Sequence, residues 1–281
     1  MSQPGEDELP VRVRNALLDA LEALDEHRDS VVVVGAQAVY LHTGAADVAL
    51  AEATKDSDLA LDTRRLEDEP LIEQAMRAAG FHQDLVKAQP GAWLSRDGIP
   101  VDLMVPEALA GSSGRRAARI DPHARDAARR AVGLEAAVVD NIQMDIPSLA
   151  VDNDRRYVAK VAGPASLLVA KLHKLGERRD TNPDRLNNKD AHDVYRLLVA
   201  IHTAVLADSL RALRTDELAG PVTVRALEYL QDLFAAGPDA TGSAMAGRAE
   251  EGVGEPKTVA ASVAILAKDL LTALGDRQTG T

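Results

Sequence analysis

The sequence has 281 residues, a formal net charge of −12 at pH 7 and no cysteine. This length allows one large domain or two small ones with a sizeable core. A sequence without cysteine has no disulfides, thiolate zinc sites or cysteine nucleophiles. The acidic balance disfavours non-specific binding of nucleic acid over the whole surface, although a local basic groove remains compatible with it.

The sequence also gives an expectation about location. No continuous apolar run approaches the roughly 18 residues that cross a bilayer. Residues 1–9 are acidic and lack the basic start and apolar stretch of a signal peptide. We therefore expect a cytoplasmic protein with no membrane partner.

The first predicted elements form a helix–strand–turn–helix unit. Apolar residues at helical spacing predict a helix over residues 11–26. Four consecutive valines, residues 31–34, predict a short buried strand. Gly35 ends this strand and a second helix follows over residues 36–42. The Ala-rich residues 45–53 have no predicted conformation.

Further elements follow in the first half of the chain. Alternating residues 58–62 predict a half-buried strand. Residues 66–79 predict a helix that Gly80 closes. Residues 92–105 predict a β-hairpin with its turn at Asp97-Gly98.

The rest of the chain becomes helical. Residues 111–131 contain many arginines after a Gly/Ser stretch and predict a mobile insertion, and residues 132–150 predict one or two strands. After Gly163-Pro164 we expect helices, with loops near residues 180–188 and 237–256. The expected organisation is an α/β domain over residues 1–155 and a helical domain over residues 156–281.

Three carboxylates are the strongest candidates for chemistry. Asp56 and Asp58 begin a strand two residues apart, so they point to the same face. Asp102 lies inside a later strand, where Asp is disfavoured. If the two strands are neighbours, the carboxylates meet and can bind Mg²⁺ or Mn²⁺ for two-metal transfer of phosphoryl or nucleotidyl groups.

Each of these features has a plainer interpretation. An isolated Asp-Ser-Asp is more often a turn or a solvated strand edge, and a lone Gly after a strand is usually a turn. Gly35 gains a functional interpretation from the helix that follows it, because backbone N–H groups at a helix N-terminus bind phosphate. The order of the features favours the functional interpretation.

A basic stripe is predicted in the second half. Lys171, Lys174 and Arg178 are three and four residues apart on one helix, and Asp190 lies near the start of the next. The functional interpretation is a cationic wall that meets a triphosphate, with Asp190 holding Lys171 or touching the nucleotide. The plain alternative is a solvated helix face with capping residues.

These motifs resemble the nucleotidyltransferase superfamily. The resemblance spans about residues 31–200 and rests on four segments: Val34-Gly35-Ala36-Gln37-Ala38, Thr54-Lys55-Asp56-Ser57-Asp58-Leu59, Ala170-Lys171-Leu172-His173-Lys174-Leu175 and Lys189-Asp190-Ala191-His192-Asp193. The last two resemble the AbiEii branch, which includes abortive-infection and toxin–antitoxin nucleotidyltransferases and the MenT toxins.

The resemblance implies a fold and an activity. The implied fold is a mixed sheet flanked by helices, followed by a mostly helical half that completes the active site. The implied reaction is Mg²⁺-dependent transfer of a nucleotide from an NTP, with Asp56, Asp58, Asp102, Lys171 and Asp190 as site residues. Gly35, Ala36, Lys171, Lys174 and Arg178 would contact the NTP. RNA, including tRNA, is the first acceptor to consider, and a cognate antitoxin is an implied partner.

One departure and two alternatives stand beside this hypothesis. Ala36 occupies the position where the family usually has Gly or Ser, so a hydroxyl contact to phosphate is missing. An acidic surface would also suit transfer to a small molecule or a protein hydroxyl. A degenerate NTP-binding or antitoxin-like module is the non-enzymatic alternative.

Overall fold

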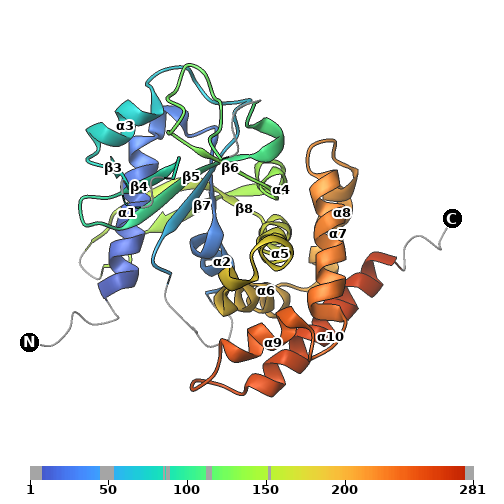
Figure 1. Ribbon diagram of the computed structural model, residues 1–281. Coiled ribbons are helices and arrows are strands. Elements are labelled where there is room, and N and C mark those ends of the chain that lie inside the picture. The colour runs from blue at the N-terminus through green and yellow to red at the C-terminus, as the bar shows by residue number, and fades with distance from the viewer. Residues whose placement is uncertain are drawn as a thin grey trace, which may run out of the picture. The chain divides into compact units, whose positions relative to one another are not determined.

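The computed structural model describes residues 8–44, 54–84, 86, 89–111, 116–150 and 153–275 (Figure 1). It divides into two compact units. The sheet unit comprises Met1–Ala38, Ala53–Leu134 and Asn141–Ala162, and the helical unit comprises Val39–Glu52, Glu135–Asp140 and Gly163–Thr281. The boundary predicted between residues 155 and 156 falls just before the last strand of the sheet, and the helical unit resumes at Gly163.

The described residues of the sheet unit form an eight-stranded mixed sheet, in the order β3-β4-β5-β2-β1-β8-β7 with β6 also paired to β5. The strands are β1 (Val31–Val34), β2 (Ser57–Leu61), β3 (His82–Gln83), β4 (Ala92–Leu94), β5 (Pro100–Pro106), β6 (Arg129–Ala131), β7 (Asn141–Pro147) and β8 (Arg156–Ala162). The predicted α/β class with a mixed sheet is confirmed, as are the valine strand and the hairpin that turns at Asp97-Gly98.

Helices cover this sheet. They are α1 (Glu8–Ala23), α3 (Ile72–Ala78) and the short η1 (Asp25–His27) and η2 (Glu107–Leu109), and α2 (Gly35–Thr43) begins in this unit. α1, the blue helix in Figure 1, packs on β2, β5 and β8, and its Leu17 and Leu18 are fully buried. The apolar spacing that predicted this helix therefore marks its buried face.

Two elements of the sheet unit differ from expectation. α3 begins at Ile72 rather than residue 66, because Pro70 disfavours helical geometry at the residue before it. Gly80 closes the helix at φ +91°, as predicted. β2 is fully buried at Leu59–Leu61 rather than half-buried, because it lies between β1 and β5 in the middle of the sheet.

The predicted mobile insertion is wrong for the residues that the structure describes there, 116–131. Ala118, Ala127 and Ala128 are completely buried, and the indole N–H of Trp93 donates to the Ala127 carbonyl at 3.0 Å. The segment ends in β6, whose arginines pair with carboxylates of the sheet unit. Residues 45–53 and 112–115 lie outside the described residues. Residues 132–150 form one strand, β7, as the prediction of one or two strands allowed, and a short helix that was not predicted.

The helical unit contains the elements after β8 together with one short helix before it. They are α4 (Glu135–Val139), α5 (Pro164–Thr181), η3 (Pro183–Arg185), α6 (Asn188–Ala200), α7 (Thr203–Thr215), α8 (Gly220–Leu230), the π-helix η4 (Gln231–Ala235), α9 (Thr241–Arg248) and α10 (Pro256–Gly275). The predicted helical C-terminal half is confirmed. α9 lies where a loop was expected, because Met245 and Ala246 are buried where it packs on α6 and α10.

One described helix, α10, is long and apolar enough to cross a membrane by length and composition, which the search for continuous apolar runs missed. Its Val263, Ala267 and Leu270 are buried, whereas Lys268 and Asp269 are exposed. α10 packs on α7 and α9 within the helical unit. This pattern is typical of an amphipathic helix that covers a protein core.

Candidate functional site

Asp58 and Asp102 are direct neighbours in the sheet. β2 and β5 run parallel, and Asp58 is the register partner of Asp102. Neighbouring strands lie about 4.7–4.9 Å apart and register partners point to the same face. Val101 and Leu103, on either side of Asp102, are completely buried on the other face. The sequence predicted that Asp102 joins Asp56 and Asp58 if the two strands are neighbours, and the pairing of β2 with β5 meets this condition for Asp58 and Asp102.

Asp56 lies just before β2 and completes the predicted trio along the chain. Ser57 and Leu59 are completely buried, whereas Asp56 is exposed and Asp58 is intermediate. The Thr54 hydroxyl donates to the Asp56 carboxylate at 3.0 Å. Thr54 therefore holds the Asp56 side chain just before the strand, which gives Thr54 a structural role.

Gly35 lies against the Asp58 carboxylate. Its φ of +69° is in the left-handed region, and a Cβ added there would lie 2.1 Å from an Asp58 carboxylate oxygen. The contact follows from the sheet, because β1 pairs with β2 so that Val34 is opposite Asp58. Only glycine suits both the backbone angle and the close approach. The segments around Gly35 and Asp58 thus form one local structure, in which Ala36 is the second residue of α2 and has a buried side chain.

Sequence reasoning missed Arg129. Its guanidinium donates to the Asp102 carboxylate at 3.2 Å, and both side chains are about one-fifth exposed, 22% and 19%. β4 begins at Ala92, opposite Asp102, and beyond this point β6 pairs with the same edge of β5, with Arg129 opposite Met104. A residue opposite Met104 shares a face with Asp102. The short strand after the Arg-rich segment was the signal that could have placed it.

The carboxylates fit a divalent cation by type and by register. Asp oxygens are the ligands that Mg²⁺ and Mn²⁺ prefer. Among the residues that the structure describes, no three His, Cys, Asp or Glu side chains are grouped so that they could hold a metal ion as they stand. Asp58 and Asp102 are register partners, and Asp102 makes its ion pair with Arg129.

The predicted basic stripe of α5 converges on Asp190 of α6. The Asp190 carboxylate accepts from the Lys171 ammonium at 3.1 Å, from Lys174 at 2.8 Å and from an Arg178 guanidinium nitrogen at 3.0 Å. Lys171 also donates to Asp193 at 2.6 Å. We call these five side chains the Asp190 network. Sequence reasoning placed Asp190 beside Lys171 and omitted Asp193 from the site.

The local sequence explains this convergence. Lys171, Lys174 and Arg178 share a helix face because they are three and four residues apart. Asn187 caps α6 by accepting from the Lys189 backbone N–H at 2.9 Å. The cap fixes the start of α6, so that Asp190 is presented in its first turn.

Burial divides the Asp190 network into two parts. The side chains of Lys171, Asp190 and Asp193 are 7%, 6% and 1% exposed, whereas Lys174 is 43% exposed and Arg178 is 24% exposed. Burial by itself raises the pKa of Asp190, but the charges of Lys171, Lys174 and Arg178 outweigh it and leave the pKa below its ordinary value. The solvated alternative for Lys171 is therefore wrong.

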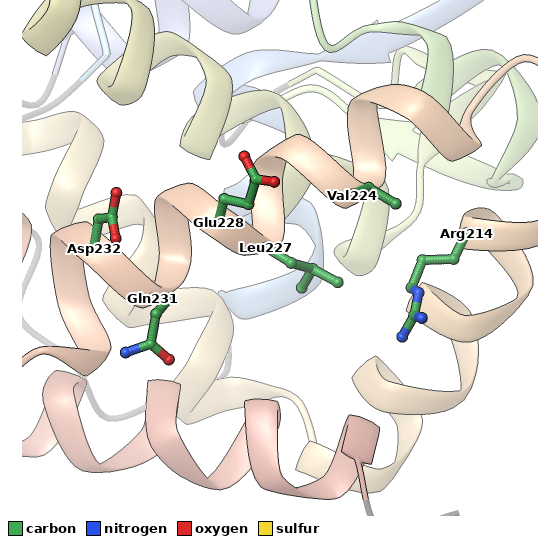
Figure 2. Close-up of a pocket in the computed structure, with 6 residues that line it drawn as sticks. All are labelled: Arg214, Val224, Leu227, Glu228, Gln231 and Asp232. Carbon is green, nitrogen blue, oxygen red and sulfur yellow. The ribbon is translucent and has the colours of Figure 1, made fainter. Parts of the chain in front are cut away.

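A cavity of about 400 Å³ lies elsewhere in the helical unit. Its lining combines residues of α7, α8 and η4, shown in Figure 2: Arg214, Val224, Leu227, Glu228, Gln231 and Asp232. In Figure 2 the Leu227 side chain of α8 is directed toward Arg214 of α7. The lining includes none of the predicted site residues.

Comparisons with known proteins find weak similarity to solved structures and none to family profiles or curated sequences. No protein-family profile matches the chain, and no curated protein matches its sequence. An antigenic nucleotidyltransferase-like protein from Paracoccidioides brasiliensis is similar at 16% identity and a TM-score of 0.38, over 79% of this chain and 93% of that one. An H. pylori protein provisionally assigned as a nucleotidyltransferase is similar at 9% identity and a TM-score of 0.34, over 95% and 96%. Both scores are low, so the proposed function rests on this chain's own residues.

Proposed function

We propose that the protein is a metal-dependent nucleotidyltransferase. The observation that supports this most directly is the register of Asp58 with Asp102, beside a glycine that the Asp58 carboxylate requires. Like charges directly opposite each other destabilise a sheet. A cation bound between Asp58 and Asp102 would offset this repulsion and would explain why the sheet keeps both carboxylates.

The proposed reaction transfers a nucleotide from an NTP to a hydroxyl. The acceptor oxygen attacks the α-phosphorus, a new P–O bond forms, and the bond to the β-phosphate oxygen breaks to release diphosphate. Asp102 would hold a metal or accept the hydroxyl proton. Bound Mg²⁺ or Mn²⁺ would supply positive charge to the triphosphate and the attacking oxygen. Asp56 and Asp58 would hold it, and backbone N–H groups at Gly35 and Ala36 would receive phosphate oxygens.

The Asp190 network is proposed to contribute cations to NTP binding. Lys174 and Arg178 are its more exposed members, so they are the groups available to a phosphate. Lys171 is buried between Asp190 and Asp193, so its proposed role is to hold the network together.

The acceptor and the biological setting are proposed from the sequence motifs. RNA, including tRNA, is the first acceptor, in an AbiEii- or MenT-like toxin–antitoxin or phage-defence setting in the cytoplasm. A small molecule or a protein hydroxyl is the alternative acceptor, and the net charge of −12 favours it.

A second candidate function is a non-catalytic NTP-binding or antitoxin-like module. The ion pair of Asp102 with Arg129 favours it, because a guanidinium that stays on this carboxylate would replace the metal permanently. A module of this kind would bind a nucleotide or partner protein without turnover.

The test is label transfer by the purified full chain. Each of the four α-labelled NTPs is incubated with Mg²⁺ or Mn²⁺ and with total RNA or cell lysate, and the labelled fraction is identified. We expect Asp58→Asn to lower transfer by at least about 100-fold, the size of effect seen when one transition-state charge contact is lost. Asp97→Asn, an exposed carboxylate in the β4–β5 turn, is the matched control and should retain activity. Transfer that survives in both Asp56→Asn and Asp58→Asn would exclude this site, and no transfer by the wild type to any fraction would favour the non-catalytic module.

A further inference from the structure

Arg129 lies on the carboxylate face of the sheet because of a change of strand at one edge of β5. β4 pairs with Pro100–Asp102, and β6 pairs with Met104–Pro106. Gly91 lies at the change: a Cβ there would be 2.2 Å from the Leu103 carbonyl oxygen and 2.7 Å from the Arg129 backbone nitrogen. The backbone therefore places Arg129 opposite Met104, two residues along β5 from Asp102 and on the same face.

The bond between Arg129 and Asp102 is an incomplete one. A guanidinium and a carboxylate commonly form two parallel bonds. Here a single terminal nitrogen of Arg129 donates to Asp102, and Nε of Arg129 is buried with no hydrogen-bond partner. A buried donor without a partner costs free energy. Nε of Arg129 can therefore donate to a further acceptor that binds close to Asp102.

We propose that the Arg129 guanidinium serves as a temporary counter-ion for Asp102. When metal and nucleotide bind, Arg129 leaves Asp102 and binds a phosphate of the nucleotide instead. This inference rests on the proposed nucleotidyltransferase function. The guanidinium neutralises Asp102 next to Asp58 before binding. A divalent cation on the carboxylates would repel the guanidinium. Phosphate oxygens then satisfy its donors, because the planar fork of arginine matches a phosphate.

The exchange predicts opposite effects on two ligands. Without Arg129, metal binding no longer competes with a guanidinium, so Arg129→Gln should bind Mn²⁺ about tenfold more tightly in the absence of nucleotide. The same variant should bind a non-hydrolysable NTP analogue with Mn²⁺ about tenfold more weakly, because a charged contact to phosphate is lost. If Arg129 had only a structural role, its replacement would not raise the affinity for either ligand.

The experiment is calorimetric titration of Mn²⁺, and then of the NTP analogue, into the wild type, Arg129→Gln, Arg129→Lys and Arg130→Gln. Arg130 is the matched control, since it is the next residue of β6 and pairs with Glu107 at 2.8 Å. Arg129→Lys keeps the charge and should keep Mn²⁺ affinity near wild type. Fluorescence of Trp93, the single tryptophan, checks that the sheet unit of each variant is folded.

The outcomes separate this inference from the function on which it rests. Opposite shifts in Arg129→Gln, with neither in Arg130→Gln, support the exchange. If the wild type binds Mn²⁺ and nucleotide, and Arg129→Gln leaves both affinities unchanged or shifts both in the same direction, the exchange is overturned and the proposed function is not. If Arg129→Gln does not fold, reduced nucleotide affinity with unchanged Mn²⁺ affinity in Arg129→Lys supports the exchange, and unchanged affinity for both overturns it. A folded wild type that binds neither ligand overturns the proposed function and this inference together.

Discussion

Asp102 in β5 and Asp190 in α6 are both held by cationic side chains, but the two carboxylates are held very differently. Asp102 accepts from Arg129 at 3.2 Å and lies directly beside another carboxylate, Asp58. Asp190 accepts from three cations at 2.8–3.1 Å and is almost completely buried. The helical unit therefore uses a carboxylate for cohesion, whereas the sheet unit concentrates carboxylates where a ligand could use them.

Removing Asp190 should have the largest effect on stability. We expect Asp190→Asn to lower the free energy of unfolding of the helical unit by about 3 kcal/mol or more, because Lys171 stays buried with less compensation. Far-UV circular dichroism in urea follows this unit, and Trp93 fluorescence follows the sheet unit. Asp232→Asn is the control, since Asp232 is 60% exposed and pairs with Arg179 at 3.6 Å, so the loss should stay below about 1 kcal/mol. Equal losses in the two variants would contradict the role of the network.

The stability that the Asp190 carboxylate contributes should be lost in acid. Its pKa is lowered in the folded protein, so the folded state holds the proton less tightly than the unfolded chain does. The stabilisation is complete above the unfolded pKa near 4 and is lost as pH falls below it toward the folded pKa. The stability gap between wild type and Asp190→Asn should therefore be constant from pH 5 to 7 and shrink below about pH 4. A gap that widened in acid would contradict this.

The sequence predicted the local elements of the site better than its long-range contacts. Gly35 directly follows the valine strand, as predicted, and β2 begins at Ser57, one residue before the predicted start; both features depend on nearby residues. The register of Asp58 with Asp102 depends on the pairing of β2 with β5, which could be stated from the sequence only as a condition.

The pairing of Arg129 could not be predicted from local patterns. Its position depends on β6 joining β5 beyond the end of β4, and composition alone favoured a mobile segment. The same limit explains Lys171. The spacing of residues in a helix shows which side chains share a face. It does not show that Asp190 and Asp193 pack against that face and bury Lys171.

Lys174 and Lys171 should separate ligand binding from cohesion. Lys174→Ala should lower NTP affinity by about tenfold, the loss of one charged contact to phosphate. Its effect on unfolding should stay small because its side chain is 43% exposed. Lys171→Ala should instead destabilise the helical unit, because Asp190 and Asp193 lose their shared buried cation. Titration with an NTP analogue and urea unfolding measure the two effects, and a Lys171→Ala variant with wild-type stability would be inconsistent with the network.

The smallest expected effect has the opposite sign. Asp58→Asn removes one of two like charges that face each other across β2 and β5, and asparagine keeps the shape of the side chain. In metal-free buffer we expect the stability of the sheet unit to stay unchanged or to rise by up to about 1 kcal/mol. Urea unfolding followed by Trp93 fluorescence measures this change.

Asp62→Asn provides the matched comparison for Asp58→Asn. Asp62 directly follows β2, is 2% exposed and accepts from Arg64 at 2.8 Å, so its replacement should lower stability by about 1–3 kcal/mol. Added Mn²⁺ should stabilise the wild type and Asp62→Asn, because a ligand that binds only the folded state shifts unfolding by mass action. It should stabilise Asp58→Asn much less. If Asp58→Asn loses as much stability as Asp62→Asn and gains equally from Mn²⁺, then Asp58 belongs with Asp190 as a cohesive carboxylate, and the contrast between the two regions fails.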